Sequence, residues 1–203
     1  MRHPEFFDSV PHIRLRDALA ALLGAVDDGV IDYGYIDAVK LAGHSCPTVA
    51  SAYGLTRLAL RELYGDEMAE RGGVRVALGA GQGEGTAGVI ASVATLLTGA
   101  AGDGGFKGLA GRYGRRQLLS FSQDIPLEIR YSRIDNGAAV DAAADLGRVP
   151  AAPEARTLLQ LCLAGDADRS QQREFGRLWQ DRVRRILVDH GEDPEVFILR
   201  RAS

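Results

Sequence analysis

The dipeptide Asn136-Gly137 lies between two stretches of alternating pattern and constrains the fold more than any other feature of the chain. Asn-Gly is the preferred sequence of a two-residue β-hairpin turn, because both positions adopt positive φ angles in a type I′ turn. Residues 127–134 alternate apolar and polar side chains, which predicts a half-buried strand, and residues 138–146 are expected to return as its partner. We therefore expect an antiparallel or mixed sheet built around this hairpin.

Helices and further strands complete an α+β pattern. Residues 48–63 and 89–97 carry apolar side chains at helical spacing, whereas residues 74–78 alternate as a strand does. Residues 117–121 are expected to form another strand. The predicted fold class is therefore α+β, with a mixed or antiparallel sheet and helices packed on one face.

The N-terminal part is predicted to be helical. Residues 1–11 form a polar lead that contains proline, and apolar residues from Leu15 to Val26 recur at helical spacing. Asp27-Asp28-Gly29 is expected to end that helix. Residues 30–39 are expected to form a short helix or turn that leads to His44.

A proline-containing linker at residues 149–153 divides the chain into two predicted parts, an α+β domain at 1–148 and an extension at 149–203. The extension is expected to contain helices at 154–163 and 170–190, with an edge strand at 196–199. Within the second helix, six apolar side chains form a stripe along one face: Phe175, Leu178, Trp179, Val183, Ile186 and Leu187. We predict a helical hairpin packed on the core or on a second protomer, and a homodimer.

Composition excludes several classes of partner. The net charge of −3 argues against binding to nucleic acid or to an anionic membrane. No apolar run is long enough to span a bilayer, and residues 1–10 lack the apolar core of a signal peptide. Cys46 and Cys162 lie far apart, and no disulfide is expected. The chain is predicted to be cytoplasmic, with reduced thiols.

His44 and Cys46 are the strongest candidates for chemistry. Imidazole and thiolate are ligands that zinc and other late first-row transition metals prefer. Pro47 suits the first position of a helix, so Cys46 should lie at the N-terminus of that helix, where the helix dipole favours a thiolate. His12 would supply a third ligand if the N-terminal arm folds across the domain. The competing interpretation is a buried cysteine beside a histidine bonded to backbone.

Three functions remain open for this pair. A metal with an open coordination position would make the protein a metal-dependent enzyme of unspecified reaction, acting on a small-molecule ligand. A non-catalytic module would hold a metal or haem for delivery. Without metal, Cys46 would be a catalytic nucleophile, with His44 or His12 as its base.

The same segment resembles a known family. Gly43-His44-Ser45-Cys46-Pro47, with Ala52-Tyr53 in the helix after it, is similar to the Gly-His-x-Cys-Pro segment of the FmdE-like family, which takes its name from formylmethanofuran dehydrogenase. A second, looser match comprises Leu97-Thr98-Gly99, Gly102, Gly104, Leu109 and Tyr113-Gly114-Arg115. The resemblance spans roughly residues 40–133. It implies metal-associated chemistry in one-carbon or redox metabolism, and a homodimer.

This chain departs from the family at several positions. Ala42 stands where members often have a second histidine, and Ala100 replaces a family cysteine. A family Cys-x-x-Asp falls on Val89 and Ser92, and the cysteine-rich zinc module of many members is absent. His44 and Cys46 are what survives of the family's polar positions. The further ligands stay open, with Glu84, Asp103 and Asp124 as unranked candidates.

Two glycine-rich loops offer alternative ligand sites. Residues 83–88 match Gly-x-Gly-x-x-Gly, but no second parallel strand is expected after the next helix, so two glycine turns that allow close backbone packing are preferred over a nucleotide site. In residues 99–114, glycines can expose backbone N–H groups to an anion. A cofactor or substrate anion is therefore predicted at Gly102, Gly104, Gly105 and Lys107, against the alternative of a solvated basic loop.

Overall fold

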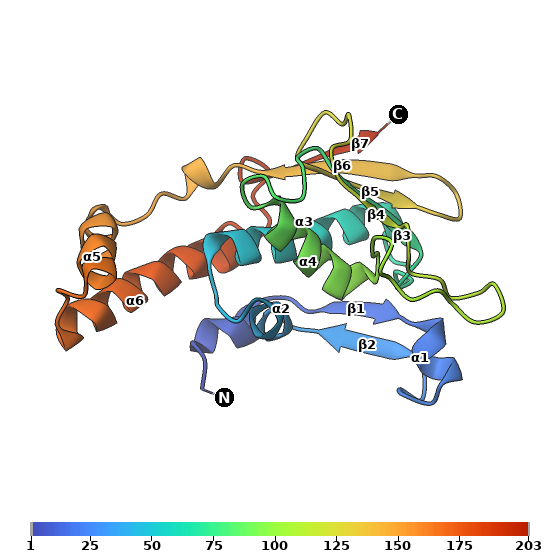
Figure 1. Ribbon diagram of the computed structural model, residues 1–203, viewed down its shortest axis with the longest axis horizontal. Coiled ribbons are helices and arrows are strands. Elements are labelled where there is room, and N and C mark those ends of the chain that lie inside the picture. The colour runs from blue at the N-terminus through green and yellow to red at the C-terminus, as the bar shows by residue number, and fades with distance from the viewer. Residues whose placement is uncertain (1, 203) are drawn as a thin grey trace.

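The computed structural model describes residues 2–202 as three stacked layers (Figure 1). A five-stranded sheet forms one outer layer. Helices α3 (Pro47–Tyr64) and α4 (Ala87–Thr98) form the middle layer and pack on one face of the sheet. A two-stranded ribbon and helix α2 (Tyr35–Ala42) form the third layer. The predicted α+β class, with helices on one face of the sheet, is confirmed.

The sheet contains the predicted hairpin. Its order is β4-β3-β5-β6-β7, and only the β3–β4 pair is parallel. The strands are β3 (Val74–Leu78), β4 (Leu119–Ser120), β5 (Ile129–Arg133), β6 (Ala139–Ala144) and β7 (Phe197–Ala202). Two expectations need correction. The strand predicted at 117–121 is only two residues long, and it does lie parallel to β3 after α4, where no parallel strand was expected.

Helix α3 is the centre of the core. Pro47 occupies its first turn, where the missing proline N–H costs no hydrogen bond. Its middle residues are buried and several of them are small, and Gly54 lies against the ring of Phe197 on β7. An ideal Cβ on Gly54 would come within 2.7 Å of that ring. The absence of a side chain at Gly54 therefore sets how closely the helix approaches the sheet.

We expect Gly54→Ala to destabilise the protein by about 1–3 kcal/mol, because the buried Phe197 ring has no room to move. Gly176→Ala is the matched control, since Gly176 is also inside a helix but nothing lies within 4 Å of its ideal Cβ. That control should gain about 0.5–1 kcal/mol from helix propensity alone. Urea unfolding of both variants tests the contrast, and a stabilised Gly54→Ala protein would contradict it.

The N-terminal prediction was wrong in type and extent. Residues 13–16 form strand β1 (Ile13–Arg16), which pairs antiparallel with β2 (Val30–Tyr33). Helix α1 (Ala18–Leu22) spans only part of the expected helix. Asp17 caps α1, because its carboxylate accepts the Leu19 and Ala20 amide hydrogens, and the helix therefore starts at Ala18 and not at Leu15.

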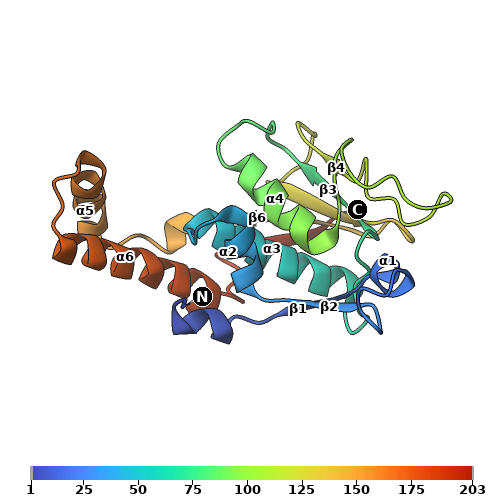
Figure 2. The ribbon, with the colours of Figure 1, turned by 60° about the horizontal axis from the view of Figure 1, so that its bottom comes forward.

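The predicted C-terminal hairpin is present, but it projects from the other layers and does not pack along the core (Figures 1 and 2). It consists of α5 (Pro153–Ala164) and α6 (Arg169–Arg184), and a π-helical turn, Arg185–Asp189, continues α6 toward the core. We call α5, α6 and the linker at 149–152 the arm. After the arm the chain returns to the sheet as β7. Among the helices of residues 2–202, none combines the length and apolar character needed to cross a bilayer.

Candidate functional site

The loop between α2 and α3 carries His44, Ser45 and Cys46, and both of its ends are fixed. Gly43 ends α2 in the left-handed conformation, with φ of 77°, and its N–H donates to the Val39 carbonyl. Cys46 is extended, with φ of −147° and ψ of 167°, as expected for a residue that precedes proline and caps a helix. A left-handed glycine and a proline therefore hold the three residues in one short, ordered turn.

Cys46 places its thiol at the N-terminus of α3. Its Sγ accepts the Val49 N–H at 3.5 Å, and the residue is 9% exposed. The thiol thus lies at the positive end of the dipole of an 18-residue helix. The predicted position of Cys46 at the mouth of the helix is what the structure shows.

His44 is exposed and its ring orientation is set by backbone. Its Nδ1 lies 2.9 Å from the Ala42 carbonyl oxygen, so Nδ1–H donates that bond. The neutral ring then carries its free lone pair on Nε2. A bond of this kind from the other ring nitrogen is the usual way in which proteins orient a metal-binding histidine.

Ser45 ties the loop to two distant parts of the chain. Its carbonyl accepts hydrogen bonds from Trp179 Nε1–H at 2.9 Å and from Gln180 Nε2–H at 3.2 Å. Its hydroxyl donates to Gln180 Oε1 and accepts from the Tyr35 hydroxyl, each at 2.9 Å. Burial raises the pKa of Tyr35 far above its ordinary value, so the phenol stays a donor. The loop is therefore anchored to α6 and to α2.

The sequence alone did not predict these anchors. Trp179 and Gln180 lie about 135 residues after Ser45, and Tyr35 lies 10 residues before it at the start of α2. Trp179 was assigned to an apolar stripe, and its indole N–H was the one signal that it needed a polar partner.

His12 is not brought to the His44–Cys46 pair. It precedes β1, its Nδ1–H donates to Asp32 Oδ1 at 3.1 Å, and its ring packs against Gly34 at the start of α2. His44 follows the end of the same helix, and eight helical residues span about 12 Å. Within residues 2–202 no group of three or more His, Cys, Asp or Glu side chains is arranged to hold a metal ion.

The loop at residues 99–114, predicted to bind an anion, does not present a row of free backbone N–H groups. The Gly102 carbonyl accepts hydrogen bonds from the Gly105 and Gln117 amides, at 3.0 and 3.2 Å, so the Gly105 N–H is already used. Gly104 and Lys107 are exposed. The neighbouring Arg115 turns inward, where its guanidinium bonds to the buried Asp17.

Within residues 2–202 the remaining candidate carboxylates do not join the pair in a metal-binding group. Glu84 folds back within its own loop, where it accepts the Gly81 N–H at 2.6 Å. Asp103 accepts a 3.4 Å hydrogen bond from the Gln117 side chain, and Asp124 is exposed. Two of these three carboxylates therefore have local partners within the loops that carry them.

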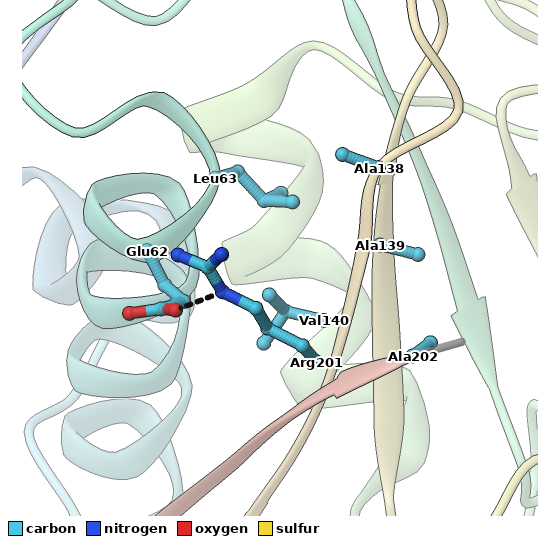
Figure 3. A pocket seen from close by; sticks show the side chains of 7 residues that line it. All are labelled: Glu62, Leu63, Ala138, Ala139, Val140, Arg201 and Ala202. Atoms are coloured by element: carbon cyan, nitrogen blue, oxygen red, sulfur yellow. Dashed lines mark hydrogen bonds and ion pairs between the residues drawn. The ribbon is translucent and has the colours of Figure 1, made fainter.

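A hollow of about 160 Å³ lies between the end of α3 and strands β6 and β7 (Figure 3). Its lining is alanine, Val140, Leu63 and the ion pair between Arg201 and Glu62, whose atoms are 2.6 Å apart. This lining contains no histidine, cysteine or hydroxyl group. The His44–Cys46 loop therefore remains the stronger candidate for chemistry.

Comparison with known proteins adds no assignment. None of the known protein families to which the chain was compared matches it, and no curated protein matches it. The chemistry of the loop therefore rests on its own residues.

Proposed function

We propose that the loop at residues 43–47 binds a transition metal, zinc in the first place, through His44 Nε2 and Cys46 Sγ. The observation that carries the proposal is the hydrogen bond from His44 Nδ1–H to the Ala42 carbonyl, because it leaves Nε2 free as an acceptor of metal. The position of Cys46 at the N-terminus of α3 supports it, since metal binds the thiolate. The resemblance to the FmdE-like family points to the same two residues.

Two ligands from the protein leave coordination positions open to water or a small molecule. A metal so held polarises a carbonyl group or activates water. In this proposal His44 and Cys46 bind, while the anchored Ser45 fixes the spacing between them. The resemblance to the FmdE-like family implies one-carbon or redox metabolism as the setting of such chemistry. His12, paired with Asp32 elsewhere, is not needed for it.

The test is elemental analysis of natively purified protein. We expect near-stoichiometric metal in the wild type and its loss in His44→Ala and in Cys46→Ala. Cys162→Ser and His12→Ala are the matched controls, because they remove the same side-chain types away from the loop, and both should retain metal. Retention of metal in His44→Ala, or loss in the controls, would contradict the ligand assignment.

The measurement also separates the alternatives. A visible absorbance band would indicate haem rather than zinc. If the wild type is folded and free of metal, rapid alkylation of Cys46 would favour a nucleophile at the helix N-terminus. An inert thiol would remove that function as well.

A further inference from the structure

A hollow of about 240 Å³ lies between the start of α1, the turn that precedes β3 and the loop between α4 and β4. Four charged side chains line it, and three of them are arginines: Arg71, Arg112, Arg115 and Glu70. We call it the arginine hollow. Binding sites for whole small molecules usually enclose about 300–1,000 Å³, so this hollow has room for an ion or for the charged end of a larger ligand.

Two of the arginines share one buried carboxylate, that of Asp17. Arg71 Nη1 lies 3.1 Å from Asp17 Oδ2, and Arg115 Nη2 lies 2.9 Å from Asp17 Oδ1. The Arg115 side chain is only 10% exposed, and burial lowers its pKa because it disfavours the charged form. A single carboxylate balances only one of the two guanidinium groups. The cluster therefore holds an excess of positive charge at a place where an unpaired charge is destabilising.

Arg112 brings a third guanidinium group to the same hollow. Its backbone is fixed, because its N–H and its carbonyl both bond to Leu109, at 2.9 and 2.8 Å. Its guanidinium carbon lies 5.0 Å from the centre of the Tyr113 ring. Tyr113 has φ of 62°, a left-handed conformation that residues with a side chain rarely adopt and that persists only where the surrounding structure enforces it. The loop therefore holds Arg112 in a set position at the hollow.

We propose that the arginine hollow binds a phosphate group, either inorganic phosphate or the phosphate of a small phosphorylated molecule. A phosphate would supply the missing negative charge, and its oxygens accept hydrogen bonds from guanidinium groups on several sides. A carboxylate has two oxygens in one plane and suits a single guanidinium fork. Glu70 opposes a bound anion, but it is exposed and screened by solvent, whereas Arg115 is buried.

The proposed phosphate site differs in position from both sites considered above. It contains none of residues 43–47, so it goes beyond the proposed metal-binding function. It also differs from Gly102, Gly104, Gly105 and Lys107, where the sequence predicted an anion. Its arginines come from two segments about 40 residues apart in the chain, which meet only in the folded protein.

Isothermal titration of the purified protein with sodium phosphate, at an ionic strength held constant with chloride, tests the proposal. We expect saturable binding of one phosphate per chain. Arg112→Gln should weaken that binding about tenfold or more, because it removes a charge-assisted hydrogen bond. Arg112→Lys should lie between the two, since it keeps the charge without the planar fork. Arg112 is chosen because Arg71 and Arg115 also hold Asp17, so their loss would disturb the fold.

Arg116→Gln is the matched control. Arg116 is another exposed arginine of the same loop, but it does not line the hollow, so this variant should bind phosphate within about twofold of the wild type. Thermal unfolding gives a second readout, because a ligand that binds only the folded state raises the Tm. At one phosphate concentration the Tm should rise equally in the wild type and Arg116→Gln, and by less in Arg112→Gln.

A phosphomonoester, phenyl phosphate, identifies the source of the phosphate group. Tighter binding than inorganic phosphate would indicate the end of a larger molecule, and weaker binding would indicate the free ion. The absence of saturable binding, an equal affinity for acetate, or an unchanged affinity in Arg112→Gln overturns the proposal. His44→Ala and Cys46→Ala should bind phosphate as the wild type does, so failure of the metal site leaves this result intact. Loss of phosphate binding in those two variants would place the anion on the metal and overturn it.

Discussion

Replacing Asp17 with alanine is expected to lower the free energy of unfolding by about 3–5 kcal/mol, because it leaves buried positive charge without a partner. Asp17 is 4% exposed. Its Oδ2 lies 3.1 Å from Arg71 Nη1, and its Oδ1 lies 2.9 Å from Arg115 Nη2. One carboxylate thus joins the N-terminal ribbon to two loops that border the sheet, and it also caps α1.

Urea unfolding measures this loss of stability, and two further variants separate the contribution of the charge from that of the helix cap. Asp17→Asn keeps a capping side chain but removes the charge, so it should be destabilised nearly as much as Asp17→Ala. Asp168→Ala removes the exposed cap of α6, whose carboxylate accepts the Ser170 and Gln171 amide hydrogens, and should cost about 1 kcal/mol. Equal costs for Asp17→Ala and Asp168→Ala would show that the ion cluster contributes nothing beyond the cap.

The pH dependence of the same residue has a defined sign. Burial raises the pKa of Asp17, but the Ala20 amide and the charges of Arg71 and Arg115 outweigh it and hold the pKa below its ordinary value of 3.8. The carboxylate form is therefore favoured in the folded state. Its contribution is complete above the pKa of the unfolded chain and is lost as pH falls through the folded pKa. Below about pH 4 the wild type should lose stability more steeply than Asp17→Asn.

Elements with a strong local pattern could be predicted from the sequence. The turn at Asn136-Gly137 and the pattern on both sides of it predicted β5 and β6 to within two residues at each end. Pro47 predicted the start of α3, because proline suits the first turn of a helix, and the structure ends the helix at Gly65, a glycine with positive φ. The arm followed from one linker and two helical patterns.

What the sequence could not provide was pairing between distant segments. Ile13 and Leu15 fit either a strand or a helix, and the choice depended on β2 lying beside them. Likewise Arg115, which lies beside the predicted anion loop, is drawn inward by Asp17, which lies 98 residues earlier. The anchors of Ser45 come from 10 and about 135 residues away. Local spacing singled out His44 and Cys46 as candidates, but it could not show what holds the loop between them.

Gly72→Ala is expected to be as damaging as loss of Asp17, at more than about 3 kcal/mol. Gly72 has φ of 86°, and an ideal Cβ there would overlap the Arg115 guanidinium. That group is fixed by Asp17 on one side and by the Arg71 carbonyl on the other, so it cannot move aside without breaking the cluster.

Gly137→Ala separates the steric overlap from backbone strain. Gly137 has φ of 75°, and nothing lies within 4 Å of its ideal Cβ, so its replacement should cost only the left-handed strain, about 1–2 kcal/mol. The double variant Asp17→Ala/Gly72→Ala should lose less stability than the sum of the losses in the two single variants, because both substitutions break the same contacts of Arg115. Additive losses, or equal costs at Gly72 and Gly137, would mean that Arg115 does not hold these segments together.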